Sequence, residues 1–293
     1  MSGPVRSADL ADESTSAELL EARITEVGGV PVRRLLPKRT RRTVGAWCFV
    51  DHLGPTDVAL DIGPHPHIGL HTVTWLLDGE VLHRDSLGSE QAIRPGQLNL
   101  MTAGHGIAHS EETPASYRGA HHGVQLWVAQ PESTRHGGPA FEHHAELPVV
   151  EQPTFTATVL VGELAGARSP ARSDTPLVGA DLRLRAGRTV LPLDPAFEHA
   201  VAVFDGAARV DGHAVEAGTL AYLAPGRDEL VLDGDARALL LGGEPFDDTV
   251  LMWWNFVART RGEVDAARAD WNSGSDRFGA VASPLDRIPA PQS

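Results

Sequence analysis

The chain has 293 residues, a mean hydropathy of −0.16 and a formal net charge of −14 at pH 7. This acidic balance argues against direct binding of nucleic acid, because proteins that bind DNA or RNA normally present a basic face. The chain has no run of about 18 apolar residues, so we expect neither a transmembrane helix nor a membrane partner. The N-terminus is acidic and Ser-rich, unlike a signal peptide. The single cysteine, Cys48, cannot form a disulfide within the chain, and we expect a cytoplasmic protein.

Residues 1–22 are predicted to be a disordered N-terminal segment. From Ile24 onward, short β-prone segments are separated by Gly, Pro and Asp, which is typical of an all-β sandwich or barrel. These segments cover residues 44–50, 72–77, 81–84, 92–93, 97–101, 123–128 and 155–160. Asp78 and Gly79 follow the second segment directly and predict a hairpin turn.

The second half of the chain repeats the pattern of the first half. Residues 72–79 resemble residues 199–206, and residues 93–98 resemble residues 215–220. A repeat of long period indicates two copies of one unit, which here predicts two small β-barrels in tandem. Chance similarity between hairpins is the alternative explanation.

We divide the chain into an N-terminal barrel, a C-terminal barrel, and a C-terminal helix and tail, over residues 23–150, 151–246 and 247–293. In the last part, the aspartates at 247–248 could cap a segment that runs through residues 252–256. Residues 260–272 are predicted to be a short helix. The first of them is a threonine suited to an N-cap, and Glu263 follows three residues later, as in a capping box. The tail from about Ser273 is rich in Gly, Ser and Pro and is predicted to be mobile.

Two pairs of polar residues give the strongest functional signal. His65 and His67 form the first pair, and His109 and Glu111 form the second about forty residues later. Each pair has an i, i+2 spacing, which on a β-strand points both side chains to one face. Two such strands could hold one metal with three imidazoles and a carboxylate. This ligand set suits Fe, Mn, Ni, Cu or Zn better than Ca or Mg.

The histidines are concentrated in the first half of the chain, since 12 of the 14 lie before residue 150. The positions of the second repeat that correspond to the two pairs fall near Pro192, Asp194, Val231 and Asp233. These residues do not reproduce the ligand set. We therefore expect a metal in the N-terminal barrel and no metal ligands of this pattern in the C-terminal barrel.

The motifs around these pairs resemble the pirin family, a two-barrel branch of the cupin superfamily whose members are called bicupins. The resemblance is carried by residues 51–55, 65–69, 72–74, 83–88, 101–104 and 109–111, with weaker agreement at 242–245 and 253–256. It implies two tandem cupin barrels and one transition metal ion, most often iron, with Cu, Ni, Mn, Co or Zn as alternatives. Matched motif by motif, the implied metal ligands are His65, His67, His109 and Glu111.

The chain departs from the commonest pirin pattern next to the first pair. Ile68 follows the histidines where the family often has Arg, and His105 also stands where Arg is common. His71 takes a position where other cupins have a ligand carboxylate. We interpret His71 as a hydrogen-bond donor near the site or as a solvent-side residue, with a fifth metal ligand as the weaker alternative. His83 and Asp85 alternate on a predicted strand and either hydrogen-bond near the site or face solvent.

The resemblance leaves several functions open. Some pirins cleave the flavonol quercetin with O2, so one hypothesis is a quercetin 2,3-dioxygenase with a flavonol-like substrate. In that case Glu111 would be the catalytic base, a role that competes with its role as a ligand. A second hypothesis is a non-enzymatic, metal-dependent or redox-sensing regulator that binds a protein partner. An isomerase or another small-molecule cupin is a third, and a closed structural Zn site also fits the ligands. We expect a monomer. A cavity of several hundred Å3 with apolar walls would favour a substrate.

Overall fold

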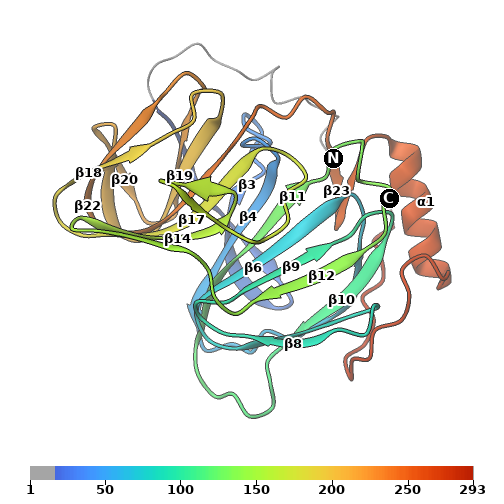
Figure 1. The fold of residues 1–293 in the computed structure, drawn as a ribbon. Helices are drawn as coiled ribbons and strands as arrows, with labels where there is room; N and C mark the ends of the chain where they lie inside the picture. Colours follow the sequence, from blue (N-terminus) through green and yellow to red (C-terminus); the bar gives the residue numbers. More distant parts are fainter. Residues whose placement is uncertain (1–16, 293) are drawn as a thin grey trace.

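Strands with alternating side chains build two β-barrels in the computed structural model, which describes residues 17–292 (Figure 1). The N-terminal barrel consists of two facing sheets. The larger sheet has the strand order β12 (Ala140–His144), β9 (Leu98–Thr102), β6 (Leu70–Asp78), β11 (His121–Ala129), β4 (Trp47–Thr56), β3 (Val30–Leu36) and β2 (Arg23–Val27). The smaller sheet has the order β5 (Ile62–His67), β10 (Ile107–Glu112), β7 (Val81–Asp85) and β8 (Glu90–Ile93).

The C-terminal barrel is built from one continuous sheet. Its strand order is β1 (Glu18–Glu21), β21 (Thr219–Leu223), β19 (Glu198–Val210), β22 (Glu229–Gly243), β17 (Leu177–Leu184), β14 (Phe155–Val161) and β13 (Val149–Gln152). Strand β18 (Arg188–Pro192) pairs with β22, and β20 (His213–Glu216) pairs with β19. A small hairpin of β15 (Glu163–Leu164) and β16 (Ala167–Arg168) follows β14.

The sheet topology confirms the predicted fold class and explains the sequence repeat. Strand β6 lies between β9 and β11, and the corresponding strand β19 lies between β21 and β22. Each of the seven predicted β-prone segments overlaps a strand of the structure. The repeat therefore reflects two copies of one barrel, because equivalent sequence segments take equivalent places in the two sheets.

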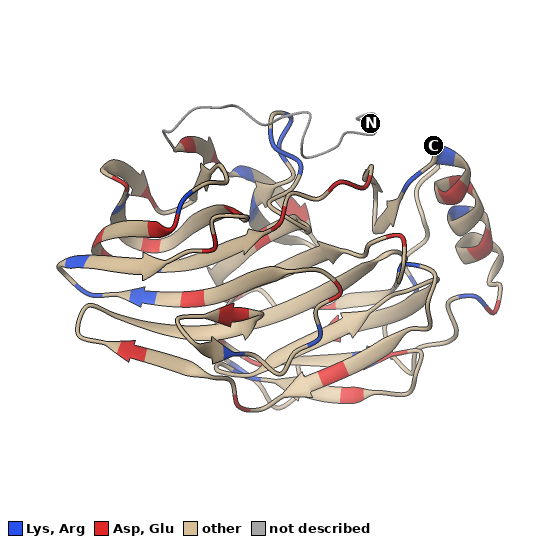
Figure 2. Ribbon diagram, turned by 45° about the horizontal axis from the view of Figure 1, so that its top comes forward, with Lys and Arg blue, Asp and Glu red and all other residues tan. Residues whose placement is uncertain are grey.

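The two barrels share one hydrophobic core along their contact. Trp47 on β4 is fully buried and donates from its indole Nε1 to the carbonyl oxygens of Val178 and Gly242, at 3.1 and 3.2 Å. Cys48 is also buried, and burial raises the pKa of its thiol to about 12. Figure 2 shows Lys and Arg interspersed with Asp and Glu along the strands and loops, in accordance with the net negative charge.

The N-terminal segment differs from its prediction. Strand β1 lies within the segment predicted to be disordered, and it pairs with β21 of the C-terminal barrel. Leu20 on this strand is buried against the shared core, which fixes a segment whose polar composition gives little local signal. The remainder of the prediction, over residues 1–16, lies outside the described residues. Strand β13 begins at Val149, close to the predicted barrel boundary, and pairs with β14.

The C-terminal part of the chain returns to the N-terminal barrel. The segment expected to follow an aspartate cap is instead a hairpin of β23 (Leu251–Trp253) and β24 (Phe256–Ala258). It meets the end of β5, where the Val257 amide donates to the carbonyl of Ile68 at 3.1 Å. A turn at Trp254, with φ of 51°, reverses the chain. These tertiary contacts override the local helix-start signal.

The predicted C-terminal helix is confirmed as α1 (Arg261–Ser273). The Thr260 hydroxyl accepts from the Glu263 amide at 3.2 Å, as the capping pattern predicts. Helix α1 packs beside the N-terminal barrel (Figure 1), and no described helix is long and apolar enough to cross a membrane. The tail after α1 is predicted to be mobile, but hydrogen bonds attach it to the rest of the protein. Trp271 Nε1 donates to the carbonyl of Ile288 at 2.8 Å, and the Ile288 amide donates to the carbonyl of Pro64 at 2.9 Å.

Candidate metal centre

Three histidines of the two predicted pairs converge inside the N-terminal barrel. His65 and His67 lie on β5, and His109 lies directly opposite His65 on the antiparallel strand β10. All three side chains are buried, and their potential ligand nitrogens lie within 4.8 Å of one another. The Nε2 atoms of His67 and His109 are 3.0 Å apart. Among the described residues, no other group of three or more His, Cys, Asp or Glu side chains brings its potential ligand atoms so close to one another.

The other ring nitrogen of each histidine is held by a partner outside the cluster. His65 Nδ1 donates to the carbonyl of Gly63, and His67 Nδ1 donates to that of Asn255, both at 2.9 Å. His109 Nδ1 faces Nδ1 of His83 at 3.4 Å. With the protons on Nδ1, the Nε2 lone pairs all point into the cluster. Lone pairs turned toward one another repel unless a cation lies between them, so this arrangement fits a metal ion.

Burial keeps the three imidazoles in the form that binds metal. It lowers the pKa of His65 to about 4 and holds the pKa values of His67 and His109 well below their ordinary 6.5, with the neighbouring histidines adding to the effect. Neutral imidazole is the ligand form of histidine, so protons do not compete with a metal here near neutral pH. The donor set also matches the preference of transition metals for imidazole.

A chain of hydrogen bonds continues outward from His109. If His109 Nδ1 donates to His83, then His83 Nε2 donates to Asp85 Oδ2, at 3.1 Å. The other carboxylate oxygen of Asp85 accepts from the amides of Leu87 and Ser89, at 2.9 and 3.0 Å. Burial raises the pKa of Asp85, but the hydrogen bonds from His83 and Ser89 outweigh it and hold the pKa below its usual value. Of the two predictions for this pair, hydrogen bonding near the site is therefore the correct one.

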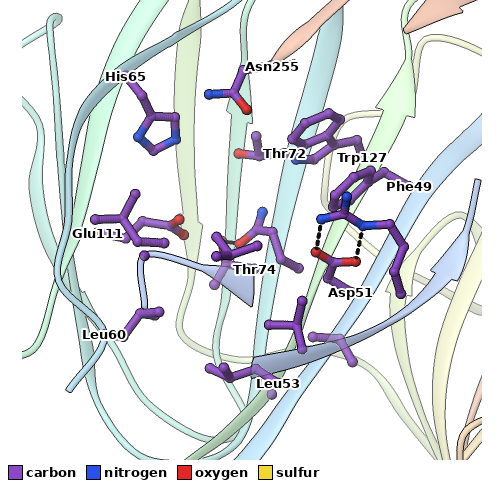
Figure 3. Close-up of a pocket in the computed structure, with 18 of the residues that line it drawn as sticks. Phe49, Asp51, Leu53, Leu60, His65, Thr72, Thr74, Glu111, Trp127 and Asn255 are labelled. Atoms are coloured by element: carbon purple, nitrogen blue, oxygen red, sulfur yellow. Dashed lines mark hydrogen bonds and ion pairs between the residues drawn. The ribbon is translucent and has the colours of Figure 1, made fainter. Parts of the chain in front are cut away.

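Glu111 lies in the same pocket but outside the group of three histidines. The register between β10 and β5 shifts between His109 and Glu111, so the second pair does not keep a regular strand geometry. Figure 3 shows the Glu111 carboxylate directed toward Thr74 rather than onto the His65 ring. Burial raises the pKa of Glu111 to about 7, against a smaller opposing effect of a hydrogen bond with Thr74. Its role as a fourth ligand stays a prediction.

The histidines open onto a cavity of about 520 Å3 inside the barrel. Its walls are largely apolar, with Val32, Leu53, Leu60, Ile62, Leu76, Val81, Val124, Phe49 and Trp127 among the lining residues. Phe49 and Trp127 stack with their ring centroids 4.0 Å apart, on the wall that faces His65 and Glu111 (Figure 3). The C-terminal segment closes part of the cavity through Met252, Trp254, Asn255 and Ile288. This is the cavity size and lining expected of a small-molecule site.

Other residues singled out in the sequence have structural roles. His71 does not reach the cluster, because its Nδ1 pairs with the Thr102 hydroxyl and its Nε2 with Asp174, at 2.9 and 3.1 Å. Trp253 and Trp254 pack with the core under α1, and Trp254 also lines the cavity. No sequence pattern indicates that Asn255 orients His67, since the two residues are 188 positions apart.

Two tandem barrels of this topology, with an internal histidine cluster in the first, define a bicupin. The family models agree: Pirin matches residues 29–128, and the Pirin C-terminal cupin domain matches residues 179–279. The chain therefore belongs to the pirin family.

Relatives of the chain match almost its full length. A protein from Pseudomonas aeruginosa named "Putative quercetin 2,3-dioxygenase PA1205" is 50% identical over 279 residues, which cover 92% of this chain and 87% of the relative. A pirin-like protein from Caulobacter vibrioides is 38% identical, with coverage of 87% and 93%. The crystal structure of quercetin 2,3-dioxygenase from Acinetobacter baumannii has 44% identity and a TM-score of 0.91, and the match covers 95% of this chain and 96% of that one.

Proposed function

We propose that this protein is a metal-dependent dioxygenase that acts on a flavonol-like substrate, with quercetin as the reference compound. The observation that carries the proposal is the convergence of three neutral imidazoles on one point at the wall of an apolar cavity of about 520 Å3. A purely structural metal site needs no such cavity. A relative that is 50% identical carries the name of the same activity, which supports the choice of substrate class.

The proposed metal ligands are His65, His67 and His109 through Nε2, with Glu111 as the fourth. Iron is the expected metal, and Cu, Ni, Mn, Co or Zn are alternatives, because imidazole and carboxylate accept all of them. When bound, the metal would supply Lewis acidity toward a substrate oxygen and redox chemistry toward O2.

The protein's own groups would bind, orient and deprotonate the substrate. The stacked rings of Phe49 and Trp127 form an apolar aromatic wall beside which a planar aromatic molecule can lie. The apolar lining excludes water, and the carboxylate of Glu111 faces the cavity from the opposite wall. We propose that this carboxylate takes the proton of the substrate's enolic hydroxyl, for which a buried carboxylate is a stronger base than one in water.

The test combines metal analysis with oxygen uptake on one protein sample. Protein purified without oxygen should hold about one transition metal per chain and consume O2 when quercetin is added. Both properties should be lost in His65→Ala and in His109→Ala, but kept in His136→Ala, a matched control at an exposed histidine. Stoichiometric metal without O2 uptake would favour the metal-dependent regulator that binds a protein partner. Absence of metal would refute the site itself.

A further inference from the structure

An ion pair lies inside the N-terminal barrel, on the wall of the cavity across from Glu111. Arg34 on β3 donates from Nε and Nη2 to the two carboxylate oxygens of Asp51 on β4, at 2.8 and 2.6 Å. Both residues line the cavity, and Figure 3 marks the two contacts of Asp51 with dashed lines. Phe49 and Leu53 flank Asp51 at i, i+2 positions of the same strand and face the same way.

Stability does not account for a charged pair at this position. The Asp51 side chain is 5% exposed and that of Arg34 is 18% exposed. Burial raises the pKa of Asp51 despite the opposing effect of Arg34. Removing two charges from water often costs as much as their attraction returns, and apolar replacements of such pairs are often neutral or stabilising. A charge pair on a largely apolar cavity wall is therefore a candidate for a binding role.

The pair has hydrogen-bonding capacity that the described part of the chain does not use. Within residues 17–292, no hydrogen bond engages Nη1 of Arg34, and each Asp51 oxygen accepts only from Arg34. On the neighbouring strand β11, the buried Nε2 of Gln125 also lacks a partner in the described part of the chain. Gln125 lines the same cavity, and its Oε1 accepts from the Thr74 hydroxyl at 3.0 Å. Unsatisfied donors at a cavity wall are expected where a ligand supplies the missing partners.

An unbroken row of rings joins the ion pair to the metal ligands. The guanidinium of Arg34 lies 4.3 Å from the centroid of the Phe49 ring. Phe49 stacks on Trp127 at 4.0 Å, and Trp127 meets the His67 ring edge-on at 5.2 Å. A planar molecule lying along this wall would have one end at the histidine cluster and the other at the ion pair.

We propose that Arg34 and Asp51 form a second polar subsite, which binds a phenolic hydroxyl at the end of the substrate remote from the metal. The phenol O–H would donate to a carboxylate oxygen of Asp51, which the two contacts from Arg34 hold in place and keep ionised. The site would then select planar aromatics that carry a metal-binding oxygen pair at one end and a ring hydroxyl at the other. This inference rests on the proposed function for the metal-binding end of the substrate.

The test compares two flavonols that share the metal-binding end. Beyond the hydroxyl at the shared metal-binding end, quercetin carries further ring hydroxyls, whereas 3-hydroxyflavone carries no other hydroxyl. Dissociation constants are measured without O2 on metal-loaded protein, from the quenching of tryptophan fluorescence. The variants are Asp51→Asn and the double variant Arg34→Met with Asp51→Leu, which leaves no unpaired charge. The matched control is the double variant Arg94→Met with Glu80→Gln, which removes an ion pair of the same two-contact geometry from the surface.

In the wild type, quercetin should bind about 10- to 100-fold more tightly than 3-hydroxyflavone, the effect of hydrogen bonds to a charged group. Both subsite variants should lose this preference at unchanged metal content, and the control should keep it. Equal binding of the two flavonols by the wild type, or a preference that survives in both variants, would overturn the inference. If the preference depends on the pair but quercetin causes no O2 uptake, the subsite stands and the dioxygenase proposal fails.

Discussion

Replacing Asp85 by Asn tests how the metal-binding form of His109 is maintained. The Asp85 carboxylate accepts from His83 Nε2 through Oδ2, while its Oδ1 accepts from the amides of Leu87 and Ser89. Asparagine keeps one carbonyl oxygen for the two amides, so the turn is preserved. Its NH2 group then faces His83 Nε2, where two donors would meet.

His83 can relieve this conflict by moving its proton to Nδ1. That nitrogen lies 3.4 Å from Nδ1 of His109, so the His109 ring would in turn be favoured with its proton on Nε2. In that form His109 cannot bind a metal. Loss of such an outer hydrogen bond typically weakens metal affinity about 10- to 100-fold, or about 1.4 to 2.7 kcal/mol.

The assay is competition for the metal with a chelator of known affinity, at pH 7. The matched control is Glu112→Gln, which alters a buried carboxylate on β10, the strand of His109, that pairs with Arg84, Ser110 and Ser283 instead. The control should retain wild-type affinity. The same affinity in Asp85→Asn as in the wild type, or an equal loss in both variants, would refute the role of the His83–Asp85 chain.

Three further variants probe the surroundings of the site. His71→Gln should keep the metal but lose about 1 to 3 kcal/mol of stability in urea unfolding, because Asp174 would lose a buried partner; loss of metal would contradict this. Burial lowers the pKa of His199 to about 4. As the pH falls from 6.5 to 4, His199 of the unfolded chain therefore binds a proton that the folded chain does not, and this group alone lowers stability by about 1.4 kcal/mol per pH unit, in addition to the other buried histidines. His199→Gln should flatten this slope in urea unfolding at pH 7 and 5, and an unchanged slope would disprove the assignment. Gly69→Ala should lower the Tm, because Gly69 has a φ of 67° and a Cβ there would lie 2.2 Å from the carbonyl oxygen of Val257. A wild-type Tm would show that the hairpin can shift away.

Features that depend on local periodicity follow from the amino-acid sequence alone. Strands alternate their side chains with a period of two, so the spacing of His65 and His67 is enough to predict that both face one side of the sheet. The cap at Thr260 and the repeat of one barrel are likewise encoded within short segments. The chain also turns after Asp78, but the predicted hairpin is wrong, because the strands before and after this turn join different sheets. For the same reason, the three histidines of the metal site can be recognised from their spacing and from the motifs around them.

The meeting of distant segments is instead a property of the tertiary fold. The carbonyl of Asn255 orients His67, and Ile288 closes the cavity, because the C-terminal hairpin and tail fold back onto the first barrel. The register of β3 on β4 sets Arg34 opposite Asp51. The shift between His109 and Glu111 likewise arises from pairing with β5. Such contacts depend on the register and closure of whole sheets, which no local pattern of residues specifies.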